Sequence, residues 1–179
     1  YVPPRPTSDL ISVALINAGN DFKGHVNVST SGHASLRDAN TLTLNNLTAA
    51  SLTANAINID QTQTGTVEVQ NTTTLAGNTV ALNNTGNDFK GQVSVEVTEQ
   101  VGLRDVNTLT VAGSSASASL NAADVAVNGL TTTGNLNVSA SNTAGLNKLT
   151  AGSLTANAAS IDQTQTGAVE VKETTTLTG

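Results

Sequence analysis

The stretch Gly19-Asn20-Asp21-Phe22-Lys23-Gly24 returns unchanged at Gly86–Gly91, 67 positions further along the chain. Both copies are followed at equal distances by Leu-Arg-Asp and then by Asn-Thr-Leu-Thr. Between Val13–Leu44 and Val80–Val111, 19 of 32 positions are identical. Self-similarity over this distance is typical of proteins built from stacked repeats.

A second block repeats with a different offset. Ser51–Gly77 returns as Ser153–Gly179, 102 positions later, with 21 of 27 residues identical. Both copies contain the whole of Ile-Asp-Gln-Thr-Gln-Thr-Gly. The two offsets differ by 35 residues, which correspond to Ala112–Leu146, a stretch without a counterpart in the first copy.

The composition favours many thin layers over one globular core. Only 11% of the 179 residues are charged and 2% are aromatic, whereas the chain has 29 Thr, 21 Asn, 15 Ser and 15 Gly. The net charge of -6 is low for a disordered chain, and small branched apolar residues recur evenly. We therefore expect a folded repeat protein.

Several classes of function are disfavoured by composition. The chain has no cysteine, so neither disulfides nor thiolate metal sites can form. A pI of about 4.6 without a Lys/Arg cluster argues against nucleic acid and against an anionic membrane surface. No apolar run approaches the ~20 residues that cross a bilayer. We expect no cofactor and no membrane insertion.

The repeats predict the domain organisation. Residues 1–10 hold all three prolines and fit no repeat, so they are interpreted as an N-terminal extension or linker. Residues 11–179 are predicted to form one repeat segment, with copies at about 13–77 and 80–179 and extra coils at about 112–146. Because this segment has no proline, every backbone N–H in it is free to join a ladder.

Short strands are predicted by apolar residues that alternate with polar ones, separated by Gly, Asn and Asp clusters. The alternating pairs are Val13/Leu15, Val26/Val28, Leu42/Leu44, Ile57/Ile59, Val67/Val69, Val80/Leu82, Val93/Val95, Leu109/Val111, Val125/Val127 and Val169/Val171. A solenoid accepts additional coils, whereas a sandwich or barrel would be broken by them. We predict an all-β, parallel β-helix of roughly eight coils, in which identical positions stack and Phe22 and Phe89 fill the core where the chain turns.

The acidic residues of the repeats are predicted to be structural. Each member of a possible catalytic or calcium-binding group occurs twice, although a catalytic residue needs one unique cleft: Asp21, Asp38 and Asp60 return as Asp88, Asp105 and Asp162. Arg37 and Arg104 are expected to pair with neighbouring surface acids. We predict no catalytic, cofactor-binding or metal-binding residue.

Two weaker candidates remain. His25 and His33 are the only histidines, and two lone histidines are poor support for a metal site, so solvated positions are expected. Thr-rich tracts at Gln61–Thr66, Thr72–Thr74 and Thr131–Thr133 leave an ice-binding face open as an alternative, although such a face needs Thr-x-Thr on every coil.

Together these motifs resemble a family. The succession Val-x-Leu-x-Asn-x-Gly-Asn-Asp-Phe-x-Gly-x-Val-x-Val, then Leu-Arg-Asp-x-Asn-x-Leu-Thr, then Ile-Asp-Gln-Thr-Gln-Thr-Gly is similar to the repeats of filamentous haemagglutinin-like adhesins. These are two-partner secretion exoproteins of Gram-negative bacteria. The resemblance covers nearly all of Val13–Gly179 and implies a right-handed β-helical shaft. Lys23 and Lys90 depart from the second glycine that the family commonly has there.

The resemblance also implies a function. We expect a non-enzymatic, structural or adhesive shaft segment of a secreted cell-surface protein, involved in virulence through cell adhesion or in biofilm. The expected partners are host-cell glycans or proteins and, during secretion, an outer-membrane transporter. An amino-terminal secretion domain has no counterpart, so an internal fragment of a longer protein is expected. In the full protein its coil ends would continue into adjoining coils, and in the fragment they are predicted to associate end-to-end. The alternatives are the stalk of a contact-dependent inhibition toxin, an ice-binding solenoid and a polysaccharide-acting β-helix enzyme.

Overall fold

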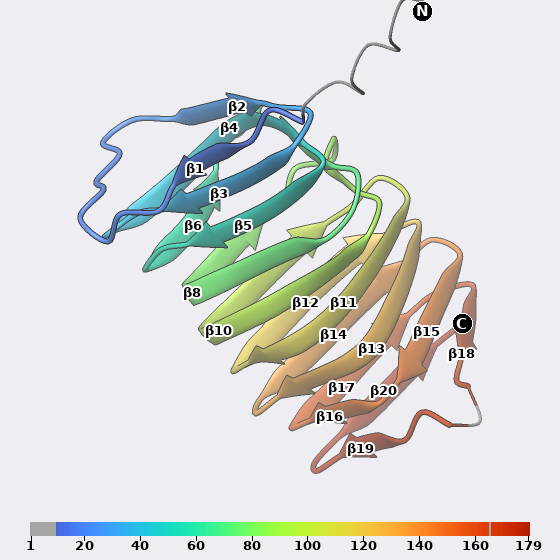
Figure 1. The fold of residues 1–179 in the computed structure, drawn as a ribbon. Coiled ribbons are helices and arrows are strands. Elements are labelled where there is room, and N and C mark those ends of the chain that lie inside the picture. The colour runs from blue at the N-terminus through green and yellow to red at the C-terminus, as the bar shows by residue number, and fades with distance from the viewer. Residues whose placement is uncertain (1–9, 165) are drawn as a thin grey trace, which may run out of the picture.

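The computed structural model describes residues 10–164 and 166–179, and within these ranges the chain is all-β, with 20 strands and no helix (Figure 1). Of the expected extension, residues 1–9 lie outside the described ranges. The strands are β1 (Val13–Leu15), β2 (Val26–Ser29), β3 (His33–Arg37), β4 (Thr41–Ala49), β5 (Ser51–Asn55), β6 (Asn58–Gln61), β7 (Val67–Val69), β8 (Thr73–Leu82), β9 (Asp88–Phe89), β10 (Gln92–Arg104), β11 (Thr108–Ser115), β12 (Ser117–Ala122), β13 (Asp124–Thr132), β14 (Asn135–Ala140), β15 (Thr143–Asn147), β16 (Leu149–Ala151), β17 (Ser153–Asn157), β18 (Ser160–Asp162), β19 (Val169–Val171) and β20 (Thr175–Thr178).

All strand pairs among the described residues are parallel, and they form three ladders along the molecule. Ladder one contains β1, β3, β5, the first half of β8, the first half of β10, then β11, β13, β16 and β19. Ladder two contains the first half of β4, β6, the second halves of β8 and β10, then β12, β14, β17 and β20. Ladder three contains β2, β4, β7 and β9, and later the starts of β11, β13 and β15 with β18.

The chain therefore winds as a parallel β-solenoid of about nine turns, each of which adds one segment to each ladder. The predicted fold class is confirmed, with slightly more turns than the roughly eight expected. The difference arises because some turns are short. Val111 and Val127 are partners in neighbouring turns although only 16 residues separate them.

The core is a set of inward columns formed by the alternating apolar residues. In ladder two successive turns contribute residues that are at most 2% exposed, which are Leu42, Ile59, Val80, Val101, Ala118, Leu136 and Leu154. Because side chains alternate across each strand, the intervening polar residues face outward. Small branched side chains suit this core, since each turn must fill a layer only one strand spacing thick.

The two repeat copies are out of phase with the turns. Val13 lies in ladder one beside Ala34, whereas its counterpart Val80 lies in ladder two between Ile59 and Val101. The 67-residue offset therefore spans three full turns and one further segment, so the second copy is displaced by one ladder, that is, by one of the three sides of the solenoid. The prediction that identical positions stack was wrong. All three sides contribute Val, Leu and Ile to the same core, so a copy rotated by one side fits equally well.

The stretch without a counterpart occupies two turns. Val111 pairs with Val127, and Val127 pairs with Leu146 in the turn after it. Asn147 therefore continues from the same side of the solenoid as Ala112.

The two phenylalanines differ in burial. Phe89 is 1% exposed and fills the core beneath Val69, its partner in the preceding turn. Phe22 packs against the core but stays only partly buried, because it belongs to the first turn of the solenoid. The predicted core-filling role is confirmed for Phe89 and holds in part for Phe22.

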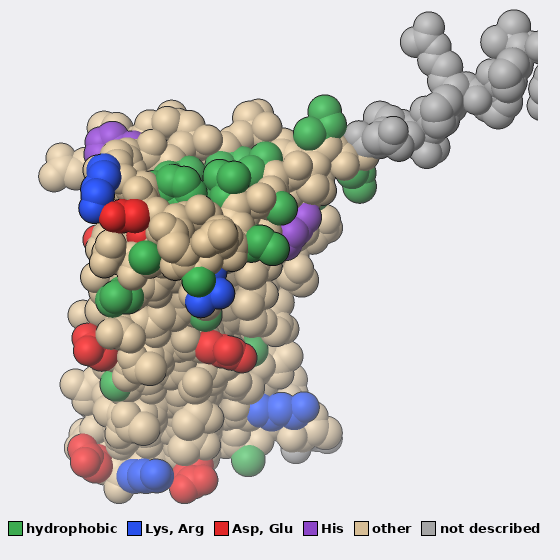
Figure 2. Space-filling model, turned by 60° about the vertical axis from the view of Figure 1, so that its left-hand side comes forward, with side chains coloured by type: hydrophobic (Ala, Val, Ile, Leu, Met, Phe, Trp, Pro, Cys, Tyr) green, Lys and Arg blue, Asp and Glu red, His purple; other side chains and the backbone are tan. Residues whose placement is uncertain are grey.

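Both ends of the solenoid expose apolar side chains that would be buried inside it. At the N-terminal end Figure 2 shows hydrophobic side chains gathered together, and the exposed ones there are Leu10, Ile11, Leu15 and Ile16. At the other end Leu177 is 53% exposed.

Candidate functional site

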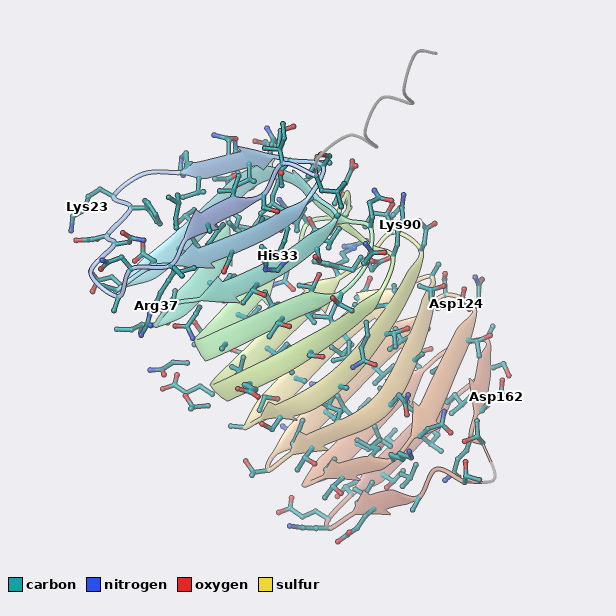
Figure 3. All side chains as sticks on the ribbon, viewed as in Figure 1. Lys23, His33, Arg37, Lys90, Asp124 and Asp162 are labelled. Atoms are coloured by element: carbon teal, nitrogen blue, oxygen red, sulfur yellow. The ribbon has the colours of Figure 1, made fainter. Side chains whose placement is uncertain are left out.

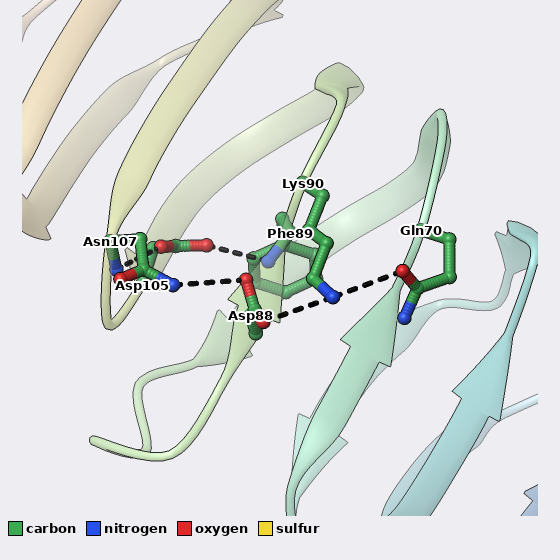
Figure 4. Close-up of polar contacts among 6 residues, drawn as sticks. All are labelled: Gln70, Asp88, Phe89, Lys90, Asp105 and Asn107. Carbon is green, nitrogen blue, oxygen red and sulfur yellow. Dashed lines mark hydrogen bonds and ion pairs between the residues drawn. The ribbon is translucent and has the colours of Figure 1, made fainter.

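The duplicated Leu-Arg-Asp motif positions a buried carboxylate between two turns. Asp105 is 3% exposed, and its Oδ2 accepts a hydrogen bond of 2.6 Å from the backbone N–H of Phe89 in the preceding turn (Figure 4). Its Oδ1 accepts a second bond, also of 2.6 Å, from the N–H of Asn107. One side chain therefore caps its own corner and ties it to the Asn-Asp-Phe corner of the neighbouring turn.

The first copy has the same arrangement. Asp38 is 3% exposed and accepts bonds of 2.7 Å from the N–H groups of Phe22 and Asn40. The 16-residue distance from Phe to Asp is thus the distance between two groups that meet across turns. This contact explains why the Gly-Asn-Asp-Phe and Leu-Arg-Asp motifs occur together in both copies.

Burial raises the pKa of the Asp105 carboxyl above its ordinary value of 3.8. The two backbone donors, Phe89 and Asn107, oppose this shift, and the nearby charge of Asp88 adds to it. The buried carboxylate is therefore costly, and its two hydrogen bonds compensate that cost in part.

The acids of the Asn-Asp-Phe motif pair with lysine and not with arginine. Lys23 forms an ion pair with Asp21, which lowers the pKa of that carboxyl and raises the pKa of Lys23; Asn40 also lowers the pKa of Asp21. In the second copy Lys90 lies 3.8 Å from Asp88, and its Nζ donates to Gln70 Oε1 at 3.0 Å. These two are the ion pairs of residues 10–164 and 166–179, so the predicted surface pairing of Arg37 and Arg104 was wrong. The lysines at the positions that depart from the family pattern take that role.

The acids considered as a catalytic group do not converge on one site. Asp21 is exposed in the first turn, Asp38 is buried in the second, and Asp60 lies in the third turn between Thr43 and Ala81. The remaining counterpart, Asp162, lies in a different ladder from Asp60, beside Gly145 (Figure 3). Among the described residues no three His, Cys, Asp or Glu side chains are grouped to hold a metal ion.

The histidines occupy surface positions near the N-terminal end. His33 is exposed and its Nδ1 lies 2.9 Å from Ser51 Oγ in the next turn (Figure 3). His25 is exposed as well. The expected solvated positions are confirmed.

A buried amide network was missed by the sequence reasoning. Asn87 is fully buried and pairs reciprocally with Gln61, through bonds of 2.6 and 3.0 Å. Its side chain also bonds to the N–H of Val67 and the carbonyl of Leu82, which completes its hydrogen bonding. Asn84 joins the network by donating to the carbonyls of Thr62 and Gly65. The recurrence of Gln in Ile-Asp-Gln and of Asn in Gly-Asn-Asp-Phe was the available signal.

Two of the surface hollows are duplicated like the motifs. One of about 350 Å³ lies over Arg104, Asp105 and Asn121, and one of about 290 Å³ lies over Arg37, Asp38 and Asn55. Each follows the corner made by the bridging aspartate, so these hollows are features of the repeat.

A surface of uniform chemistry lies on ladder two in the last four turns. We call this the uncharged face: three outward residues from each of four successive segments, namely Ser117, Ser119, Asn121, Asn135, Asn137, Ser139, Ser153, Thr155, Asn157, Thr174, Thr176 and Thr178. Rows are about 4.8 Å apart and positions along a row nearly 7 Å apart. Such an array offers hydroxyls and amides without charge.

The Thr tracts do not form one face. The hydroxyl of Thr62 is engaged with Asn45 Oδ1 at 2.5 Å, while Thr73 and Thr132 point into the core at 0% and 2% exposure. On the uncharged face only the final row carries Thr at each position. The requirement for Thr-x-Thr on every turn, which an ice-binding surface imposes, is not met there.

Comparison with known proteins finds one family. A model described as repeats of unknown function (DUF5649) matches residues 31–96, less than half of the chain. The matched part runs from β3 into β10 and contains Ser51–Gly77 together with the second Asn-Asp-Phe motif. No curated protein and no solved structure matched the chain. The described residues include no helix that could cross a membrane. The chain is thus similar, over those residues, to a family defined by repetition.

Proposed function

We propose that this chain is a non-enzymatic shaft segment of a large secreted adhesin on the surface of a Gram-negative bacterium. The observation that carries the proposal is the continuity of ladders one and two, which run from the first turns to the last. Each turn touches only its neighbours, so turns can be added to such a rod without a change in its cross-section. The resemblance of the motifs to filamentous haemagglutinin-like repeats supplies the secreted, surface-attached setting.

The mechanism is mechanical. Each turn extends the rod by about 4.8 Å, and the hydrogen bonds between turns lie nearly along its axis. The buried bridges at Asp38 and Asp105 add charge-assisted bonds to that direction. A rod of this kind holds a distal binding region away from the cell.

The uncharged face supports a weak adhesive role for the segment itself. Its hydroxyls and amides match the donors and acceptors of sugar hydroxyls. Glu173, whose carboxylate accepts a hydrogen bond of 3.1 Å from Ser153 Oγ, borders the face, so neutral glycans are the better match. A flat array contacts a ligand on one side only, so the affinity of each site is low and many repeats are needed for firm attachment.

Binding of the purified chain to immobilised host glycans and intact epithelial cells tests this proposal. The variant N137K/T155K places two lysines in the middle of the uncharged face. The variant T53K/T74K is the matched control, because these residues are outward neighbours on ladder one. We expect saturable binding that the first variant loses and the control keeps. Equal loss in both variants, or no binding by the native chain, would contradict an adhesive role and leave a spacer.

A further inference from the structure

The end of the first repeat copy stacks on the beginning of the second within this chain. We call this internal contact the template, because it shows how the two ends of separate chains could stack. Within the chain, Ser51–Gly77 is followed directly by Asn78–Gly91, which stacks on it. The C-terminal Ser153–Gly179 nearly duplicates the first of these segments, and the N-terminal Ile11–Gly24 matches the second at ten of 14 positions. We propose that copies of this chain associate head-to-tail in the register of this internal junction.

Each of the three ladders has a defined continuation. The template pairs are Ile59 with Val80, Val69 with Phe89, and Leu75 with Val95. Their counterparts at the two ends of the chain are Ile161 with Val13, Val171 with Phe22, and Leu177 with Val28. Within the described residues β18, β19 and β20 each pair with a strand on one side only, as do β1 and β2. The contact would therefore pair strand edges that are open in the single chain.

Two of the exposed apolar residues at the ends correspond to residues that the template buries. Leu177 and Leu15 are 53% and 44% exposed, whereas their counterparts Leu75 and Leu82 are 0% exposed. A hollow of about 200 Å³ opens the core at the C-terminal end, between Leu146, Ile161 and Val169. Stacking by a second copy would cover these surfaces with a layer of the right composition.

The counterparts of the buried amide pair Gln61 and Asn87 lie at opposite ends of the chain. Gln163 corresponds to Gln61 and already donates to the Gly167 carbonyl, as Gln61 does to Gly65. Asn20 corresponds to Asn87, the buried partner of Gln61. In the assembled pair Gln163 of one copy and Asn20 of the next would form the same reciprocal amide pair.

The ends depart from the template at a few positions. Lys172 stands where Gln70 accepts from Lys90, so it would face Lys23 of the next copy and weaken the contact. Ile11 and Ile16 replace Asn78 and Asn83, whose side chains are exposed in the template. Leu10 of one chain and Gly179 of the other both correspond to Gly77, so only one of them can occupy that position. Gly179 takes it, and the contribution of the next chain begins at Ile11, the counterpart of Asn78.

The assembly would be an open filament. The contact joins two different surfaces and does not close on itself. The 67-residue offset and the 102-residue offset each rotate the second copy by one side. The contact between chains combines both offsets, so successive chains would be rotated by two of the three sides. Each chain would lengthen the filament by just under nine turns, about 42 Å. This inference rests on the fold and the repeats, and it holds whether or not the chain binds glycans.

Engineered cysteines test the register, since the chain has no cysteine of its own. Asn58 and Thr79 are template partners whose side chains hydrogen-bond at 2.8 Å, and they correspond to Ser160 and Ser12. We expect S12C and S160C chains, when mixed and oxidised, to form a disulfide-linked dimer. The control D162C lies two residues out of register, beyond the Cα separation of about 7 Å that a disulfide allows, so it should not link to S12C. The proposal would be overturned if S12C formed no disulfide with S160C or with D162C. It would also be overturned if S160C by itself formed disulfide-linked dimers faster than the mixture of S12C and S160C.

Sedimentation equilibrium of the cysteine-free chain gives an independent readout. K172Q restores the template residue and removes one like-charge contact, so we expect association to strengthen by about 2- to 5-fold. K172E should strengthen it as well, through attraction to Lys23. Native chain and K172Q that both remain monomeric up to the solubility limit would overturn the proposal, as would weakening in K172Q.

Discussion

At the residue scale, the bridging aspartates explain why two motifs recur together. Asp105 joins the N–H of Phe89 to that of Asn107, and Asp38 joins the N–H groups of Phe22 and Asn40 in the same way. A carboxylate suits this role because both oxygens accept bonds, whereas an amide offers one acceptor and one donor. Duplication of these acids therefore reflects duplication of a corner.

We expect D105N to destabilise the chain by about 1–3 kcal/mol, because the amide nitrogen would meet a backbone donor and leave it without a partner. The measurement is chemical denaturation together with amide hydrogen exchange at Phe89 and Asn107. D38N is the matched control: it removes the same bonds in the second turn, so loss of protection should appear at Phe22 and Asn40. Unchanged protection of Phe89 in D105N would contradict the bridge.

The raised pKa of Asp105 predicts a pH dependence. Since its pKa in the folded chain lies above 3.8, the folded chain binds this proton before the unfolded chain as the pH falls. The contribution to stability from this group is complete below 3.8 and is lost as the pH rises through the folded pKa. We expect the difference in unfolding free energy between the native chain and D105N to widen as the pH is lowered from neutral toward 3.8. A narrowing difference would mean that the two N–H donors outweigh burial.

At the element scale, strand existence followed from alternation, and much of the core is as the pairs predict. Leu42/Leu44, Val67/Val69 and Val93/Val95 are all fully buried. The pair Ile57/Ile59 shows the limit of the pattern, because Ile57 is 48% exposed while Ala56 is buried. The chain turns a corner between β5 and β6, and alternation is not maintained across a corner.

Ladder membership could not be predicted from repeat lengths alone. Dividing 67 residues into three equal units assumes a whole number of turns, whereas turn length varies with the corners. The pairing across turns, such as Gln61 with Asn87, depends on which side each segment occupies. The bridging role of Asp38 and Asp105 required the same information.

A buried threonine gives a test of the core columns. Thr73 is 0% exposed in ladder one between Leu52 and Val93, and its hydroxyl has no hydrogen-bond partner. T73V keeps the shape and removes that unsatisfied group, so we expect a gain of about 1 kcal/mol in thermal or chemical denaturation. T175V is the control, because Thr175 is the exposed counterpart in the last strand and its substitution should change stability by less than about 0.5 kcal/mol. A loss of stability in T73V would argue against its inward position.

At the scale of the whole molecule, the rotation between copies makes the solenoid extensible without a fixed register of sides. The first copy passes directly from Leu44 to Asn45, whereas the second passes from Val111 through two additional turns before Asn147 resumes the same pattern. The chain thus contains a shorter and a longer form of one unit. This is the property that a shaft of variable length requires.

Removal of these two turns is the most direct test of a modular shaft. Deletion of 112–146 joins Val111 to Asn147 on the same side, as Leu44 joins Asn45 in the first copy. We predict a shortened chain that keeps its β-sheet circular dichroism and unfolds cooperatively at a modestly lower temperature. Deletion of 112–145 is the control: it places Leu146 directly after Val111, so two buried residues become neighbours and the inward and outward positions beyond the cut are exchanged, which should prevent folding there. Loss of folded structure in the 112–146 deletion, or equal tolerance of both deletions, would contradict the account.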